Sequence, residues 1–127
     1  MKKLMKTTLV LLFSSFILWG CTSTQIYNVN QHKITTQKSS KRVYSAIKAA
    51  GTGLGWHISK VKPGVAQGKL VVRDHMATVR IDYNRSYYTI RYVRSQNLKY
   101  NSAKGTIHKN YNGWIHNLEN AINAYLR

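Results

Sequence analysis

Residues 69–94, KLVVRDHMATVRIDYNRSYYTIRYVR, carry the pattern that decides the fold. Apolar and polar residues alternate along three short runs of this stretch, and a period of two is typical of half-buried β-strands. Turn-forming residues separate the runs, around 74–77 and at Asn84-Arg85. The stretch therefore predicts three consecutive antiparallel strands, at 69–73, 78–83 and 87–94.

The pairing of these strands follows from the requirement that apolar side chains gather on one face. A two-residue turn at Asn84-Arg85 places Ile81 opposite Tyr88, and the preceding loop places Leu70 opposite Ile81. A slip of one residue would mix apolar and polar side chains on the same face. The sequence thus predicts one apolar and one polar face for this part of the sheet.

The flanking segments extend this sheet and cover its apolar face. Trp56 to Val61 alternates and predicts a fourth strand, and Ser39 or Ser40 begins a helix that the glycines after residue 50 end. From Asn110 onward, apolar residues recur every three or four positions, which predicts a second amphipathic helix. We expect a two-layer α+β fold, in which an antiparallel four-stranded sheet carries two helices on one face, in the order α-β-β-β-β-α.

The uncovered face of this sheet is expected to be cationic. The alternation points one lysine, three arginines and a tyrosine away from the apolar side, and these residues are Lys69, Arg73, Arg80, Arg91 and Tyr87. Arginine binds phosphate and carboxylate groups through paired hydrogen bonds. We predict that this face binds an anionic partner, with Tyr87 as an aromatic platform and Lys69 in support. A merely solvated charged face is the alternative.

The charge balance narrows the classes of function. The chain has 127 residues, with 20 lysines and arginines but three aspartates and glutamates, so its formal net charge is +17. Catalysis by several carboxylates, or a calcium site built from them, fits poorly with so few acidic residues. The five histidines lack zinc-site spacing. We expect no enzyme activity, no metal and no other cofactor, and a polyanionic partner.

The N-terminus has the organisation of a secretory signal. Three lysines within the first six residues precede an apolar run, Thr7 to Leu18, that is shorter than the roughly 20 residues of a membrane-spanning helix. The following Leu18-Trp19-Gly20-Cys21 resembles the lipobox of bacterial lipoproteins. The resemblance implies that residues 1–20 are a removed signal peptide and that acylated Cys21 anchors the protein in a membrane. Thr22, in place of an aspartate that signals inner-membrane retention, favours the outer membrane.

A segment rich in Thr, Ser, Gln and Asn follows Cys21. This composition is typical of a flexible linker, so we expect residues 21–38 to be a lipidated tether with a reach of roughly 20–25 Å, and residues 39–127 to form the single domain. The alternative is an edge strand, held on the domain by apolar side chains of Ile26, Tyr27, Val29 and Ile34.

Five short motifs stand out along the domain. They are a glycine-tryptophan pair, a tyrosine-rich hairpin, a serine-x-asparagine-leucine-x-tyrosine turn, an isoleucine-histidine pair and a tyrosine-asparagine-x-tryptophan helix start. In this chain they are Gly55-Trp56, Tyr83 to Tyr92, Ser95 to Tyr100, Ile107-His108 and Tyr111 to Trp114. Together they resemble small proteobacterial lipoproteins of unassigned function. The resemblance implies a lipid-anchored, compact domain and brings no activity with it.

Four polar residues of these motifs lie between the last strand and the last helix: Ser95, Asn97, His108 and Asn112. We expect them to form a buried polar network that joins loop to helix. A small ligand pocket at the same place is the alternative.

These features predict a lipid-anchored protein of the bacterial cell envelope without catalytic activity. Its cationic sheet face is expected to bind an anionic component such as lipopolysaccharide, an acidic lipid or peptidoglycan. The alternative is a structural or assembly subunit that docks on an outer-membrane protein complex. Nucleic acid is not the expected partner, because the export signal separates the chain from cytoplasmic RNA and no RNA-binding motif is present.

Overall fold

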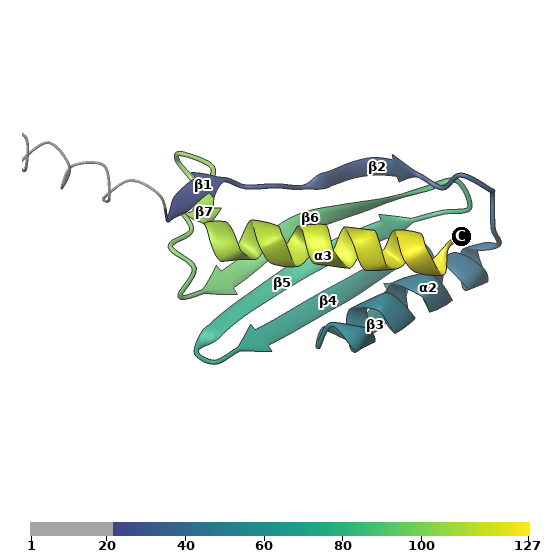
Figure 1. Ribbon diagram of the computed structural model, residues 1–127, viewed down its shortest axis with the longest axis horizontal. Coiled ribbons are helices and arrows are strands. Elements are labelled where there is room, and N and C mark those ends of the chain that lie inside the picture. Colours follow the sequence, from purple (N-terminus) through teal and green to yellow (C-terminus); the bar gives the residue numbers. More distant parts are fainter. Residues whose placement is uncertain (1–21) are drawn as a thin grey trace, which may run out of the picture.

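The computed structural model describes residues 22–127, so the predicted signal peptide and Cys21 lie outside the described residues. An antiparallel sheet forms one layer and a pair of helices forms the other (Figure 1). The main sheet has the strands β2 (Val29–Lys33), β3 (His57–Lys62), β4 (Val65–Val72), β5 (His75–Tyr83) and β6 (Tyr87–Gln96). Two short strands, β1 (Ser23–Gln25) and β7 (Thr106–His108), pair with each other. The helices are α2 (Ser40–Gly53) and α3 (Lys109–Tyr125).

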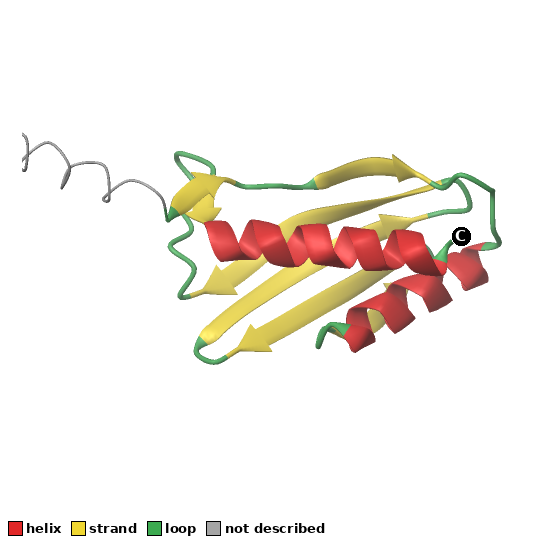
Figure 2. Ribbon diagram, viewed as in Figure 1, coloured by secondary structure: helices red, strands yellow, loops and turns green. Residues whose placement is uncertain are grey.

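The α+β class is as predicted, and both helices lie over the same face of the main sheet (Figure 2). The prediction of four strands is wrong, because the main sheet has five, in the order β2-β6-β5-β4-β3. The additional strand β2 comes from the segment expected to be a flexible tether. The same segment also forms β1, so the alternative of an edge strand describes it better than a flexible tether does.

Burial of apolar side chains explains why this polar segment joins the sheet. Val29 and Ile34 are 2% and 4% exposed, and Val29 pairs with Ile90 of β6. Gln31 has a φ of 49° at an irregularity between Val29 and His32, which breaks the alternation that would have marked a strand in the sequence. Residues before Ser39, the expected start of the domain, therefore belong to its sheets.

The hairpin of β5 and β6 keeps the predicted faces but not the predicted register. Ile81 pairs with Ile90 and not with Tyr88. Asn84 accounts for the longer turn, because its Oδ1 accepts hydrogen bonds from two backbone N–H groups of the turn, at 2.8 and 2.9 Å. A shift of two residues leaves these side chains on the same face.

The turn between β4 and β5 is shorter than predicted. Leu70 pairs with Ala77 and not with Ile81, so Arg73 and Asp74 alone connect the strands. Arg73 adopts a φ of 58°, in the left-handed region that two-residue hairpin turns require. The shift is again an even number of residues, so the apolar face is preserved.

The core lies between the sheet and the two helices. One face of α3 is fully buried, through Tyr111, Ile115, Leu118 and Ile122. α2 approaches β3 closely at Gly51, where a Cβ atom would lie 2.5 Å from Cγ1 of Ile58. Among residues 22–127, no helix has the length and apolar character needed to cross a bilayer.

Candidate anion-binding face of the sheet

The face of the main sheet opposite the helices carries cationic side chains in adjacent rows. Lys69 of β4 pairs with Thr78 of β5, and Thr78 pairs with Arg94 of β6. The next row along the sheet consists of Gln67, Arg80 and Arg91. We call this surface the open face.

The row of Lys69, Thr78 and Arg94 has the geometry of an anion cradle. Neighbouring strands lie about 4.8 Å apart, which places the backbones of Lys69 and Arg94 about 10 Å from each other. Both charged residues are exposed, whereas Thr78 between them is fully buried. Two long cationic side chains on either side of a buried residue can converge on one phosphate or carboxylate group above it.

Arg80 is bound to an acidic neighbour on its own strand. Its Nη2 and Nε donate to the Asp82 carboxylate at 3.0 to 3.2 Å. The hydrogen bond and the charge of Asp82 raise the pKa of Arg80. Arg80 is therefore less available to an external anion than Arg91, its partner across the strand pair.

Two of the predicted binding residues lie away from these rows. Arg73 occupies the turn between β4 and β5, whereas Tyr87 begins β6 at the opposite end of the sheet. Tyr87 is 39% exposed and lines a separate hollow of about 310 Å³ beside Asp82 and Thr89. The sheet thus brings together Lys69, Arg80 and Arg91, but not the predicted tyrosine platform. Alternation predicts the face of the sheet on which a residue lies. It does not predict which residues of neighbouring strands lie side by side.

The open face also contains Arg94, which the alternation of the sequence did not assign to it. The register of β5 and β6 shifts between Thr78 and Val79, so one extra residue is accommodated in β6. This bulge places Arg94 directly opposite Thr78. A β-bulge cannot be recognised dependably in a sequence. Strict alternation places Arg91 and Val93 on the open face and therefore predicts that Arg94 lies on the opposite face.

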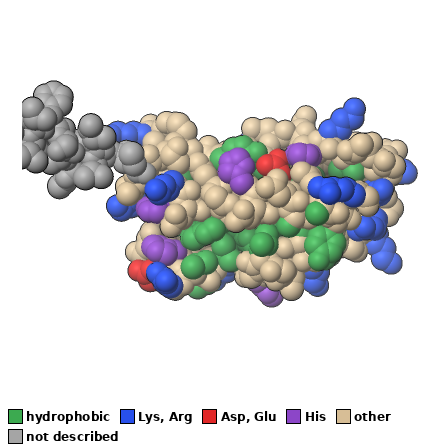
Figure 3. Space-filling view, viewed as in Figure 1, with side chains coloured by type: hydrophobic (Ala, Val, Ile, Leu, Met, Phe, Trp, Pro, Cys, Tyr) green, Lys and Arg blue, Asp and Glu red, His purple; other side chains and the backbone are tan. Residues whose placement is uncertain are grey.

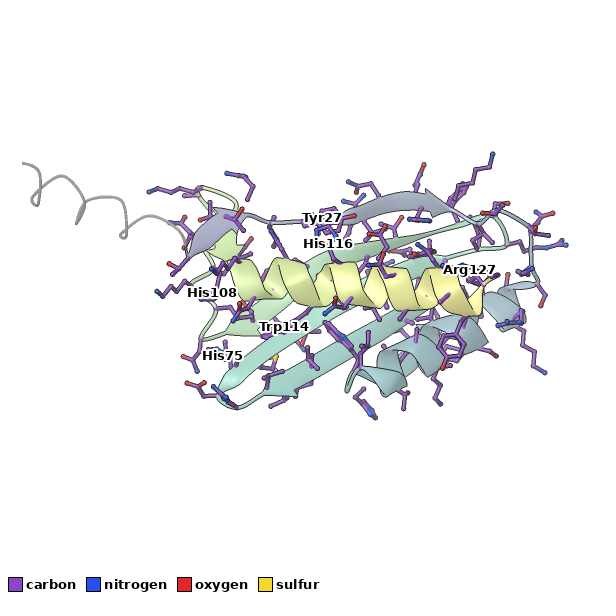
Figure 4. All side chains as sticks on the ribbon, in the orientation of Figure 1. Tyr27, His75, His108, Trp114, His116 and Arg127 are labelled. Carbon is purple, nitrogen blue, oxygen red and sulfur yellow. The ribbon has the colours of Figure 1, made fainter. Side chains whose placement is uncertain are left out.

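A second cluster of polar side chains surrounds Glu119 of α3. Its two carboxylate oxygens lie 2.7 Å from the hydroxyl of Tyr27 and 2.7 Å from Nδ1 of His32. Tyr27 stacks on His116, with 4.0 Å between ring centroids (Figure 4), and His32 stacks on Tyr88. These contacts fasten the segment of β1 and β2 to α3.

The chemistry of Tyr27 is set by this cluster. Burial, followed by the hydrogen bond to Glu119 and the charge of Glu119, raises the pKa of Tyr27 to about 12. Tyr27 therefore remains a neutral donor at physiological pH. The sequence offered one signal for this cluster, namely the single acidic residue of α3 in a chain that has three.

The four polar residues near the start of α3 use their side chains within the protein. Asn97 donates to the carbonyl of Asp74 at 2.7 Å, and Ser95 bonds to the Tyr92 hydroxyl at 2.8 Å. His108 accepts from the backbone N–H of Asn110, and Asn112 bonds to the backbone of Gln25 and Tyr27. The prediction of one buried polar network is wrong, because none of the four residues is buried and each bonds to a different part of the described chain.

Within residues 22–127, no group of three or more His, Cys, Asp or Glu side chains is placed to hold a metal ion. Comparison of the chain with protein-family models, with curated proteins and with solved structures found no match.

Proposed function

We propose that this protein is a lipid-anchored component of the bacterial cell envelope that binds an anionic group through its open face. One observation carries the proposal: the helices cover one face of the sheet and leave Lys69, Arg91 and Arg94 exposed together on the other. A folded domain does not gain stability by gathering like charges. A partner that neutralises them offsets their repulsion.

The anion that fits is a phosphate or carboxylate displayed on a surface. Guanidinium groups pair with either group through two parallel hydrogen bonds, and the lysine adds a point charge. Lipopolysaccharide and acidic phospholipid both carry such groups outside the cytosol. The lipid anchor on Cys21 would hold the domain among them.

The remaining polar chemistry supports a binding protein more than an enzyme. The Glu119 and His32 side chains form a carboxylate–imidazole pair of the kind that orients a general base. Here the same carboxylate also accepts from Tyr27, and the imidazole stacks on Tyr88. Both groups are thus engaged in holding the N-terminal segment.

The test measures retention of the acylated protein, held in detergent, on immobilised lipopolysaccharide at low and high salt. A Lys69→Gln/Arg91→Gln/Arg94→Gln variant should lose at least about tenfold in retention at low salt, since charge-assisted hydrogen bonds are lost. The matched control removes three charges elsewhere, at Lys99, Lys104 and Lys109, and should change retention by less than about twofold. Equal retention of both variants and the parent protein would overturn the proposal.

Two further measurements complete this test. Mass spectrometry of the protein from membranes should find an acylated Cys21 as the first residue, and an unmodified thiol behind an intact Met1 would refute the anchor. If the protein functions as an assembly subunit, a stoichiometric protein partner should remain bound at high salt, and the triple variant should retain that partner.

A further inference from the structure

The domain has two opposite ends, and the start of the described chain lies at one of them. Lys109 donates its backbone N–H to the carbonyl of Thr22 at 2.8 Å, so Thr22 lies beside the first residue of α3. His75 and His108 lie at this end, which we call the proximal end, and Arg127 lies at the other, distal end (Figure 4). The 17 residues of α3 separate the two ends by about 25 Å.

The proposed anchor at Cys21 lies very close in the sequence to the first strand of the domain. Strand β1 begins at Ser23, two residues after Cys21, and each residue spans at most about 3.6 Å. Acyl chains on Cys21 would therefore hold the proximal end against the bilayer. The distal end would then lie up to about 25 Å farther from that bilayer, the full distance being reached when α3 stands upright on it.

The distal end is rich in cationic side chains (Figure 3). It consists of the connection from β2 to α2, the first turn of α2, and the turns that join β3 to β4 and β5 to β6 (Figure 1). Arg42 and Arg127 lie at this end, and six further cationic residues, which we call the distal crown, are Lys33, Lys38, Lys41, Lys60, Lys62 and Arg85.

The acidic residues of the chain do not neutralise the distal crown. Asp82 is bound to Arg80, and Glu119 is bound to Tyr27 and His32. Asp74, the third of the three, lies in the turn between β4 and β5 at the proximal end. The six positive charges of the distal crown are therefore free to attract an external polyanion.

Two hollows at the distal end combine these charges with neutral polar groups. One, of about 430 Å³, is lined by Lys33, Thr35, Thr36 and Asn123 among others. Hydroxyl and amide groups beside an ammonium group suit a ligand that carries both hydroxyl and anionic groups. Such a ligand is an acidic sugar.

The other hollow adds aromatic surface. It has a volume of about 710 Å³ and is lined by Lys41, Tyr44, Ser45 and Lys60, among others. The Lys60 ammonium lies 5.4 Å from the centre of the Tyr44 ring. Aromatic rings pack against the apolar faces of sugar rings, and lysines at the rim can bind carboxylates.

We propose that the distal end binds a carboxylate-bearing glycan polymer, such as peptidoglycan, while the proximal end remains at the bilayer. This inference rests on the lipid anchor of the proposed function, and it assigns a second binding surface beyond the open face. A glycan fits better than a second bilayer, because both hollows are large enough to hold sugar units and are lined by hydroxyl groups, with an amide in the smaller one. The protein would then connect the membrane with the polymer.

The test uses full-length acylated protein in detergent and insoluble peptidoglycan sacculi as the probe. A Lys33→Gln/Lys41→Gln/Arg85→Gln variant should lose at least about tenfold in the fraction that sediments with sacculi. Two matched variants lose the same number of charges, one on the open face (Lys69, Arg91, Arg94) and one at the proximal end (Lys99, Lys104, Lys109). Both should sediment within about twofold of the parent protein.

The outcomes separate this inference from the proposed function. The inference would be wrong if the distal variant sedimented with sacculi as much as the parent protein does. It would also be wrong if all three variants lost the same share of sedimentation. Retention of the open-face variant on lipopolysaccharide is scored independently and tests the proposed function. A further assay places the protein in vesicles and adds other phosphatidylglycerol vesicles. If the distal crown clusters these vesicles and the protein does not bind sacculi, the partner is a second bilayer and the inference is wrong. Thermal unfolding of each variant checks that it is folded.

Discussion

Glu119 and His32 are 87 positions apart in the sequence, yet Oε2 of the first lies 2.7 Å from Nδ1 of the second. The carboxylate is 13% exposed and its other oxygen accepts from the Tyr27 hydroxyl. One side chain of α3 thus holds two points of the N-terminal segment. This segment leads from the proposed anchor at Cys21 to the sheet, so its attachment would set how an anchored domain sits on a membrane.

Replacement of Glu119 by Gln should loosen this attachment. The amide can accept fewer hydrogen bonds than the carboxylate and carries no charge, so we expect the free energy of unfolding to fall by about 1–3 kcal/mol. Urea denaturation measures the change. Asn120→Gln, an exposed position one residue along α3, is the control and should stay within about 0.5 kcal/mol. An unchanged midpoint for Glu119→Gln would show that the cluster does not hold the segment.

Alkaline pH should weaken the same attachment. The pKa of Tyr27 is raised from 10.0 to about 12, so the contribution of Tyr27 to stability is fully present below pH 10 and is lost as pH rises toward 12. The difference in unfolding free energy between the parent protein and Tyr27→Phe should therefore shrink across this range. Comparison with the variant cancels the titration of other groups. A difference that stays constant or grows would contradict the assignment.

The two faces of the sheet were predictable because shifts by even numbers of residues preserve alternation. Ile81 and Leu70 lie on the core side although each has a different cross-strand partner from the predicted one. The partners themselves depend on the turns, where the side chain of Asn84 and the left-handed Arg73 decide the lengths. Local propensity does not resolve such a choice.

The candidate site was predictable in part for the same reason. Lys69, Arg80 and Arg91 follow the alternation, whereas Arg94 reaches the open face through a bulge. The pairing of Arg80 with Asp82 involves residues two apart on one strand, which the alternation places on the same face without indicating their contact. The strand at Val29 was predicted only as the alternative to a flexible tether, because its core contacts come from distant parts of the chain.

Tyr111 provides a test of the core. It is fully buried, and its hydroxyl has no hydrogen-bond partner among the described residues. Tyr111→Phe removes an unsatisfied polar group, so stability should be unchanged or rise by up to about 1 kcal/mol. Tyr88→Phe is the matched control, because that hydroxyl donates to Asn123 at 2.7 Å, and it should cost about 1 kcal/mol. Destabilisation of Tyr111→Phe by as much as the control would reveal a partner for its hydroxyl.

The contact of α2 with β3 can be tested at Gly51. A Cβ atom there would lie 2.5 and 2.7 Å from two carbons of Ile58, so Gly51→Ala should destabilise the protein by about 1–3 kcal/mol despite the better helix propensity of alanine. Gly113 of α3 has nothing within 4 Å of the same position. Gly113→Ala should therefore stabilise by about 0.5–1 kcal/mol. Thermal unfolding of both variants gives the comparison, and a stabilising Gly51→Ala would mean that the two elements pack less closely.

The ion pair on the open face leads to a prediction of increased binding. Asp82→Asn removes a negative charge and releases the guanidinium of Arg80, which the carboxylate now holds at 3.0 Å. Since an exposed ion pair contributes only about 0–1 kcal/mol, the fold should be preserved. Retention on lipopolysaccharide should rise by about twofold to tenfold and become more sensitive to salt, because one more cation contacts the anion. Asp74→Asn makes the same charge change in the turn between β4 and β5 and should have the smaller effect. If both variants raise retention equally, the net charge of the protein and not the arrangement of the open face controls binding.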